Sequence, residues 1–109
     1  MIKIIKIESS KNKNKRFKIT MNNNKTYNFG LFNGSTYIDH NNKLKKDNYI
    51  KRHYNNPLEK SIITNMTISP SLFSLFILWG PYNNINKNIK HFNNIINKHH
   101  KFKLSLLYK

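Results

Sequence analysis

Cysteine, alanine, valine and glutamine are absent from this sequence of 109 residues, and glycine and proline occur only three times each. Without cysteine, the chain forms neither disulfides nor thiolate metal sites. Lysine, asparagine and isoleucine are abundant instead, which is the usage expected of AT-rich coding DNA. Lysine runs therefore reflect coding habit in part, and their number alone does not indicate a function.

Acidic residues are the most informative shortage. Glu8, Asp39, Asp47 and Glu59 stand against 20 lysines and arginines, so the formal net charge is +16. AT-rich coding explains the lysines but not the missing acids, because AT-rich codons also encode Asp and Glu. A positive field of this size attracts polyanions and acidic proteins. Four scattered carboxylates also disfavour a metal-dependent nuclease, whose cation needs several oxygen ligands.

Long apolar runs are missing as well. The apolar run at residues 71–79 is far shorter than the roughly 20 residues that span a membrane. The segment Met1–Ile7 lacks the apolar core and cleavage site of a signal peptide. We therefore expect no membrane span and no secretion signal. The length and a hydrophobic content of 38% fit a single domain, residues 1–109.

Residues 1–34 are predicted to form a three-stranded antiparallel meander. The isoleucines of the first strand change phase between Ile4 and Ile5, which indicates a bulge or a strand covered on both faces. The next two strands alternate cleanly, and Asn-rich turns and Asn33-Gly34 separate and end them. Their apolar positions are Phe17, Ile19 and Met21, followed by Tyr27, Phe29 and Leu31.

Residues 41–101 show helical periodicity. The first helix has an irregular apolar stripe of Leu44, Tyr49, Ile50 and Tyr54. A second helix is predicted from Asn56-Pro57-Leu58-Glu59, which resembles a capping box with proline at the first helical position.

Ser69-Pro70 repeats the start signal, and Gly80-Pro81 ends an almost wholly apolar third helix that we expect to form the centre of the core. The last helix is amphipathic, with Ile85, Phe92 and Ile96 among its apolar positions. Residues 102–107 fit either a last turn or an added edge strand. The predicted fold is α+β: a meander followed by three to four helices around an apolar core helix.

Several segments resemble a family of small basic uncharacterised proteins encoded by large nucleocytoplasmic DNA viruses, the giant viruses. The segments are Tyr27-Asn28-Phe29-Gly30, Ser35-Thr36-Tyr37-Ile38-Asp39-His40, Asp47-Asn48-Tyr49-Ile50-Lys51-Arg52-His53, and Ser69-Pro70-Ser71-Leu72 running to Leu78-Trp79-Gly80. Lys46 stands where the family pattern favours arginine. The resemblance implies an α+β fold and a place in the virion or the infected host cell, in the nucleus or a cytoplasmic factory. It implies no activity.

One group of residues, Asp39, His40, Tyr49, Arg52 and His53, combines side chains that transfer protons, bind metals and hold phosphates. The alternative is structural. Asp39 or His40 then fixes the loop before the first helix, Tyr49 packs inward, and Arg52 pairs with an acid or a backbone carbonyl. The structural interpretation is preferred, and we predict no catalytic residue, no metal site and no cofactor.

The leading hypothesis is a non-enzymatic protein that binds nucleic acid, DNA being the expected form, with little sequence preference and a possible role in viral genome packaging. Lysine suits this task because it contacts phosphate as a point charge. The predicted contacts are Lys46, Lys51, Arg52, Lys87, Lys90, Lys98 and Lys101. Tyr37, Tyr54 and Tyr82 are candidate stacking groups.

The alternative hypothesis is a small virion structural or adaptor protein that binds an acidic capsid or core protein. In one version of it, the helix at residues 71–79 is partly exposed and forms the contact. The spatial distribution of charge separates the interpretations further. One continuous basic face favours a polyanion track, whereas evenly spread lysines mainly confer solubility.

Overall fold

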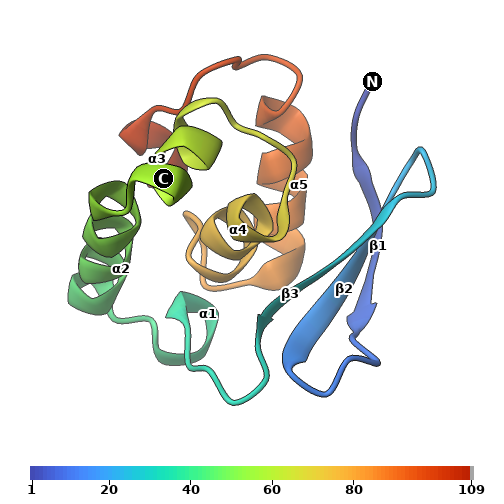
Figure 1. Ribbon diagram of the computed structural model, residues 1–109, viewed down its shortest axis with the longest axis horizontal. Coiled ribbons are helices and arrows are strands. Elements are labelled where there is room, and N and C mark those ends of the chain that lie inside the picture. The colour runs from blue at the N-terminus through green and yellow to red at the C-terminus, as the bar shows by residue number, and fades with distance from the viewer. Residues whose placement is uncertain (109) are drawn as a thin grey trace.

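A three-stranded antiparallel sheet forms one side of the molecule, and the helices pack on it (Figure 1). The computed structural model describes residues 1–108. Its strands are β1 (Ile4–Ser9), β2 (Lys15–Met21) and β3 (Thr26–Leu31), in the order β1-β2-β3. The predicted meander and the α+β class are confirmed.

β1 carries the predicted bulge. Ile4 pairs with Met21 while Lys6 pairs with Thr20, so the register shifts between them and Ile5 is the extra residue. Ile5 is exposed, whereas Ile4 is buried and Ile7 packs against the core. The bulge thus lets two isoleucines three positions apart face the same side, which is why the apolar phase changes in the sequence.

The end of β3 departs from the prediction. Phe29 is buried as expected, but Leu31 is 71% exposed. Gly30, which precedes it, has a φ of +81°, so the strand alternation breaks at this point. A Cβ on Gly30 would also lie 3.1 Å from Cδ1 of Leu78, so glycine here serves both the backbone conformation and the close packing of β3 on the core.

The helical part begins with a single turn that the sequence pattern did not predict. The helices are α1 (Tyr37–His40), α2 (Lys43–Asn55), α3 (Pro57–Thr64), α4 (Pro70–Phe73), which continues into a π-helical turn (Ser74–Leu78), and α5 (Ile85–Ile95). Residues 102–107 add no strand, because Leu104–Leu107 form a 3₁₀ turn. The predicted caps are present: Asn56 Oδ1 accepts from the backbone N–H groups of Leu58 and Glu59, and Ser69 Oγ accepts from Leu72.

α4 and the π-helical turn form the centre of the core, as predicted. Every residue from Leu72 to Trp79 except Ser74 is buried. Phe73 lies within ring-contact distance of Tyr27, Phe29 and Phe92, so it joins the sheet to α5. Because this helix is enclosed, the version of the adaptor hypothesis that uses it as an exposed contact is wrong.

Lys46 is the largest departure from the predicted pattern of α2. Its side chain is 2% exposed, whereas Leu44, which we expected to face inward, is 69% exposed. Lys46 Nζ donates to the carbonyl oxygen of Gly80 at 2.9 Å and to that of Leu107. The ammonium also lies 4.6 Å and 4.2 Å from two tyrosine ring centroids, Tyr37 and Tyr108. It therefore ties α2 to the end of the core helix and to the C-terminal turn.

The free edge at the start of β1 is covered by asparagine side chains from α5 and from the turn that follows it. Asn97 accepts from the N–H of Ile2 at 3.1 Å and donates to its carbonyl at 2.8 Å. Asn93 makes the same pair of bonds with Ile4, at 2.7 and 3.0 Å. The rise of four helical residues is about 6 Å, close to the length of two strand residues, so the two amides match alternate strand residues.

Candidate nucleic-acid interface

The outer face of α5 and its C-terminal extension gathers basic and polar side chains. Lys87, Lys90, His91, Asn94 and Lys98 follow the spacing i, i+3, i+4, i+7 and i+11, which places them on one side of a helix. We call these five residues the α5 stripe. The buried residues of the helix, Asn88, Phe92 and Ile95, lie on a different face, so the helix is amphipathic as predicted.

An open pocket of about 490 Å³ lies along this stripe. It is lined by four residues of the α5 stripe, Lys87, Lys90, His91 and Asn94, together with Tyr82 from the preceding loop. Lys87 Nζ lies 5.7 Å from the centroid of the Tyr82 ring. The pocket therefore combines an aromatic ring with cationic groups and an amide.

A buried asparagine positions Tyr82. Asn88 is fully buried, and its Oδ1 accepts from the backbone N–H of Tyr82 at 2.9 Å. Its Nδ2 donates to the carbonyl oxygens of Tyr82 and Ile77, both at 2.8 Å. Only glycine fits at position 80. A Cβ there would lie 2.0 Å from the carbonyl oxygen of Phe76 and 2.9 Å from Cγ of Asn88. The loop that carries Tyr82 is thus fixed to both flanking helical segments.

The C-terminal turn positions His91. Nε2 of His91 lies 2.7 Å from the carbonyl oxygen of Leu106. A carbonyl only accepts, so Nε2 carries the proton and Nδ1 is the acceptor nitrogen of the neutral ring. The next carbonyl, that of Leu107, accepts from Lys46. Consecutive backbone groups of this turn therefore connect the α5 stripe with α2.

The structure brings together only part of the predicted basic set. Lys87, Lys90 and Lys98 share the α5 stripe, and Lys98 Nζ donates to Asn94 at 3.0 Å. Lys101 lies apart and donates to Asn65 at 3.3 Å.

The predicted contacts on α2 do not form one surface. The prediction that Lys46 contacts nucleic acid is wrong, because its ammonium is buried and bonded to backbone carbonyls. Lys51 and Arg52 are exposed, but they line different pockets: Lys51 lies beside Leu104, and Arg52 beside His53.

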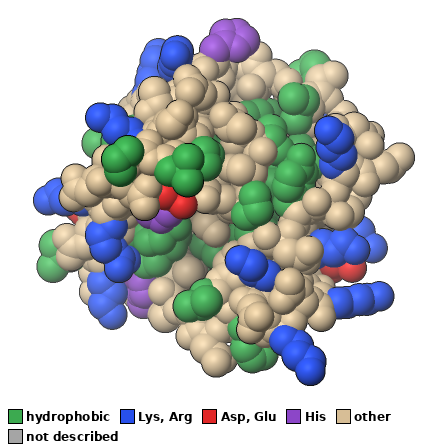
Figure 2. Space-filling model, in the orientation of Figure 1, with side chains coloured by type: hydrophobic (Ala, Val, Ile, Leu, Met, Phe, Trp, Pro, Cys, Tyr) green, Lys and Arg blue, Asp and Glu red, His purple; other side chains and the backbone are tan. Residues whose placement is uncertain are grey.

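On the face drawn in Figure 2, basic side chains do not gather into one continuous surface. Lysine and arginine side chains are spread around the rim of this view rather than gathered over one element. At the α5 stripe, helical spacing aligns several basic side chains beside a pocket.

Asp39 has a structural role, as the preferred interpretation predicted. Both carboxylate oxygens accept from the Arg16 guanidinium at 2.7 Å, which joins α1 to β2. Oδ2 also accepts from the backbone N–H of Thr36 at 2.9 Å and from its hydroxyl at 3.0 Å, closing a capping box at the start of α1. The hydrogen bonds from Arg16 hold the pKa of Asp39 well below its usual range, although partial burial opposes them.

His40, Tyr49 and His53 lie along an aromatic row. The centroids of His40 and Trp79 are 5.4 Å apart, Trp79 stacks on Tyr49 at 4.3 Å, and Tyr49 contacts His53 at 4.2 Å. Burial raises the pKa of the Tyr49 hydroxyl above its usual value. Tyr49 thus packs inward as predicted. Arg52 does not pair with an acid among the described residues, and its guanidinium lies 5.9 Å from the Tyr49 ring instead.

His40 is held in one neutral form. Its Nδ1 accepts from the backbone N–H of Asn42 at 2.9 Å, so the proton is on Nε2. Nε2 is buried and has no hydrogen-bond partner within residues 1–108. Burial lowers the pKa of His40, and the positive charge of Lys45 adds to this effect.

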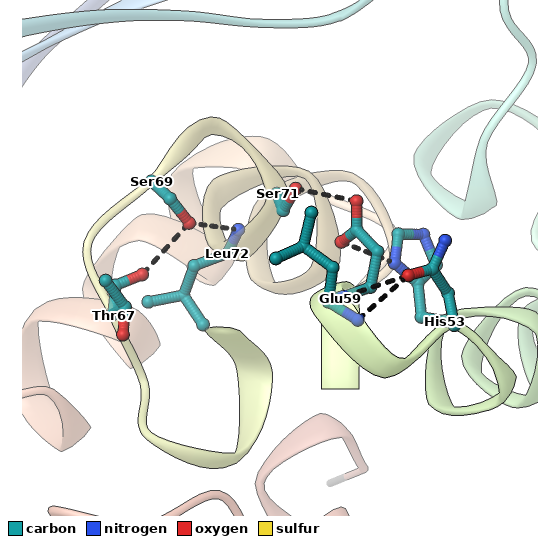
Figure 3. Close-up of polar contacts among 8 residues, drawn as sticks. His53, Glu59, Thr67, Ser69, Ser71 and Leu72 are labelled. Atoms are coloured by element: carbon teal, nitrogen blue, oxygen red, sulfur yellow. Dashed lines mark hydrogen bonds and ion pairs between the residues drawn. The ribbon is translucent and has the colours of Figure 1, made fainter. Parts of the chain in front are cut away.

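His53 belongs to a short polar chain between helices (Figure 3). Its Nδ1 lies 3.2 Å from Oε2 of Glu59, and Oε1 of Glu59 accepts from the Ser71 hydroxyl at 3.3 Å. This chain connects α2, α3 and α4. These contacts hold the three helices together. Glu59 takes part in them and does not close the predicted capping box.

All four carboxylates are thus engaged within the protein, since Lys6 pairs with Glu8 and the Tyr108 hydroxyl donates to Asp47. Within residues 1–108, no three histidine or acidic side chains come close enough to hold a metal ion. In the same part of the chain, no helix has the length and apolar character to cross a membrane.

Residues 5–53 match the model of a family of unknown function (DUF5754). The match covers most of β1, then β2, β3, α1 and nearly all of α2, which is less than half of the chain. This part is therefore similar to an uncharacterised family, while α5 lies outside the matched region. No curated protein matches the chain, and no solved structure does.

Sequence reasoning did not include His91 and Asn94 in the candidate interface. Both lie on the face of the last helix that also holds Lys87 and Lys90, so the helical spacing contained a usable signal. Tyr82 lines the same pocket because Asn88 holds its backbone in place. Residue spacing in the sequence does not reveal these hydrogen bonds.

Proposed function

We propose that the protein binds nucleic acid through the phosphate backbone, with little sequence preference, and that the α5 stripe provides the main contact. The observation that carries the proposal is the placement of Lys87, Lys90 and His91 on one helical face beside an open pocket, with Lys98 bonded to Asn94 just beyond the end of the helix. Lysine contacts phosphates as a point charge. Bidentate base reading is disfavoured, because the chain has two arginines and Arg16 is bound to Asp39.

The charge of the α5 stripe is not offset by acids nearby in the sequence. Residues 60–109 contain no aspartate or glutamate, so all acids lie before α5. Each of these acids contacts a partner from the first 71 residues or the Tyr108 hydroxyl. The stripe therefore has no acid beside it along the chain, which favours phosphate binding and rapid encounter with a polyanion.

A role in packaging a viral genome is part of this proposal. It rests on the resemblance of several segments to small basic proteins of giant viruses, and on the AT-rich character of the composition. In that setting the protein acts in the virion or in the infected cell, where a sequence-independent binder coats or condenses DNA.

The test is the salt dependence of binding to mixed-sequence DNA, measured by fluorescence anisotropy. Each neutralised phosphate contributes about 0.9 to the slope of log affinity against log salt concentration. The double variant K87Q/K90Q should lower this slope by about 2 and weaken binding at every salt concentration. The matched control is K11Q/K13Q, which removes the same charge from the exposed turn between β1 and β2.

Several outcomes would contradict the proposal. DNA binding that is absent at low salt, or that does not weaken as salt rises, would exclude a phosphate contact. Equal losses in K87Q/K90Q and K11Q/K13Q would mean that overall charge matters and the α5 stripe does not. Thermal unfolding of each variant serves as the control for intact structure.

A second candidate function is the adaptor role with an acidic protein as partner. Leu31 and Phe32 favour it, because these neighbours are 71% and 62% exposed at the end of β3. Aromatic and aliphatic side chains in this setting are typical of protein contacts. Stoichiometric copurification with a protein after complete nuclease digestion, lost in F32S, would favour this function over DNA binding.

A further inference from the structure

We propose that the pocket beside Tyr82 accepts an unpaired base, so that the protein prefers single-stranded nucleic acid to duplex. This inference rests on the proposed function and names the form of nucleic acid that the same site takes. The pocket volume of about 490 Å³ falls within the range of about 300–1,000 Å³ typical of small-ligand sites. It is large enough for more than a phosphate group.

The aromatic ring sits on a rigid support. The backbone N–H and C=O of Tyr82 are both bonded to Asn88, which is fully buried in α5. Pro81, the preceding residue, is buried as well. Asn84 then caps α5 by accepting from the N–H of Lys87 at 3.0 Å. Because the loop is fixed before binding, a ligand that uses the ring does not have to order it first.

The ring and the cations suit the two parts of a nucleotide. A base presents a flat π-face that stacks on tyrosine without regard to its identity, while Lys87 and Lys90 can hold the phosphates that flank it. In a duplex, each base is already stacked and paired, so it would first have to be extruded at a free-energy cost. An unpaired strand avoids this cost, which is the source of the expected preference.

Lys87 already lies near the Tyr82 ring, so a base has to displace it. The ammonium is 5.7 Å from the ring centroid and on an exposed side chain. Such an exposed cation–π contact is weaker than the stacking of a base on an aromatic ring. The flexible lysine can move from the ring to a phosphate, so base stacking and phosphate binding occur together.

The wall of the pocket also carries hydrogen-bonding groups. His91 donates through Nε2 to Leu106, which leaves Nδ1 of the neutral ring as an acceptor. The Asn94 side chain accepts from Lys98 through Oδ1, so its amide nitrogen is the donor on the same wall. One acceptor and one donor suit the edges of several bases, which agrees with recognition that depends little on sequence.

The experiment compares a single-stranded oligonucleotide of mixed sequence with a hairpin duplex of the same number of nucleotides, by fluorescence anisotropy at fixed salt. We expect wild type to bind the single strand at least about tenfold more tightly. Y82A should lose about 5- to 100-fold in affinity for the single strand, with little change for the duplex. Y82F keeps the ring and is the matched control, so its affinities should stay close to wild type.

The outcomes separate this inference from the proposed function. Equal binding of both forms, or a Y82A variant that binds the single strand like wild type, overturns the unpaired-base pocket while phosphate binding stands. Failure of wild type to bind either form at low salt overturns both. Photo-crosslinking of a bromouridine-containing strand gives a second measurement: adducts at Tyr82 support the inference, and adducts confined to other regions contradict it.

Discussion

Lys46 is the residue whose environment differs most from the surface position that its charge predicts. A buried ammonium is costly unless its donors are satisfied. Here the carbonyls of Gly80 and Leu107 accept from it, and the rings of Tyr37 and Tyr108 face it. The same side chain satisfies two backbone oxygens at the end of the core helix and in the C-terminal turn. It acts as a polar centre that joins three segments.

Replacing Lys46 tests this role. K46M keeps the length and apolar stem of the side chain but removes the donor, so two buried carbonyls lose a partner. Each such loss costs about 1–3 kcal/mol, offset in part by the removed desolvation of the ammonium. We expect a decrease of about 2–4 kcal/mol in the free energy of unfolding, measured by urea denaturation.

The matched control is K51M on the same helix, where the side chain is exposed. A change within about 0.5 kcal/mol is expected there. If K46M is as stable as K51M, the buried ammonium adds nothing to the fold, and this account of the C-terminal turn is wrong.

At the scale of elements, the contact between α5 and β1 is made by side-chain amides rather than by a fourth strand. Asn93 and Asn97 each pair with both the N–H and the C=O of one residue on the strand edge. Edge strands present unpaired backbone groups that favour aggregation. The two amides satisfy these groups at Ile2 and Ile4 and so protect the start of the sheet.

The double variant N93A/N97A removes four hydrogen bonds. At about 0.5–1.5 kcal/mol each, the loss is about 2–6 kcal/mol, and the higher helix propensity of alanine recovers several tenths of a kcal/mol at position 93, which lies in α5. Amide hydrogen exchange at Ile2 and Ile4 should accelerate strongly. N83A/N86A, at two exposed asparagines nearby, is the control and should leave this exchange unchanged. Unchanged protection in N93A/N97A would show that the two amides do not shield these N–H groups, and would contradict this account of the edge.

Prediction from sequence succeeded at this scale where the signal was local. The bulge at Ile5 was visible as a change of phase, and the caps at Asn56 and Ser69 as residue types just before proline. The asparagine pairs on β1 were not visible, because their partners lie 89 and 95 positions away. Leu44 was misplaced since an irregular stripe does not show which of two helix faces the rest of the chain covers.

At the scale of the whole molecule, charge governs the response to pH. His40 has a pKa below its unfolded value of about 6.5, so its contribution to stability is complete above that pH and is lost as the pH falls toward the lowered pKa. Asp39 also has a lowered pKa, so its contribution is present above about pH 4 and is lost as the pH falls further. The loss of these two contributions to stability comes on top of the repulsion among positive charges in a chain with a net charge of +16.

We therefore expect stability to fall in two steps as the solution is acidified, one below about pH 6.5 and one below about pH 4. Urea denaturation across this range measures it, and added salt should reduce the loss by screening the positive charges. D39N should be less stable by about 1 kcal/mol at neutral pH and should lack most of the second step. A constant free energy of unfolding between neutral pH and pH 3 would contradict this account.

The sequence alone determined the features that depend on neighbours along the chain. These are the alternation of β2, the bulge of β1, the helix caps, the apolar character of α4 and the amphipathic face of α5, because backbone geometry brings residues two to four positions apart onto one face. The tertiary structure alone decided that Lys46 is buried and that Tyr82 joins the α5 stripe in one pocket. The roles of both residues follow from contacts between segments that are far apart in the sequence. A buried polar group bonds to whichever partner the packed chain places beside it, and the sequence does not show which partner that is.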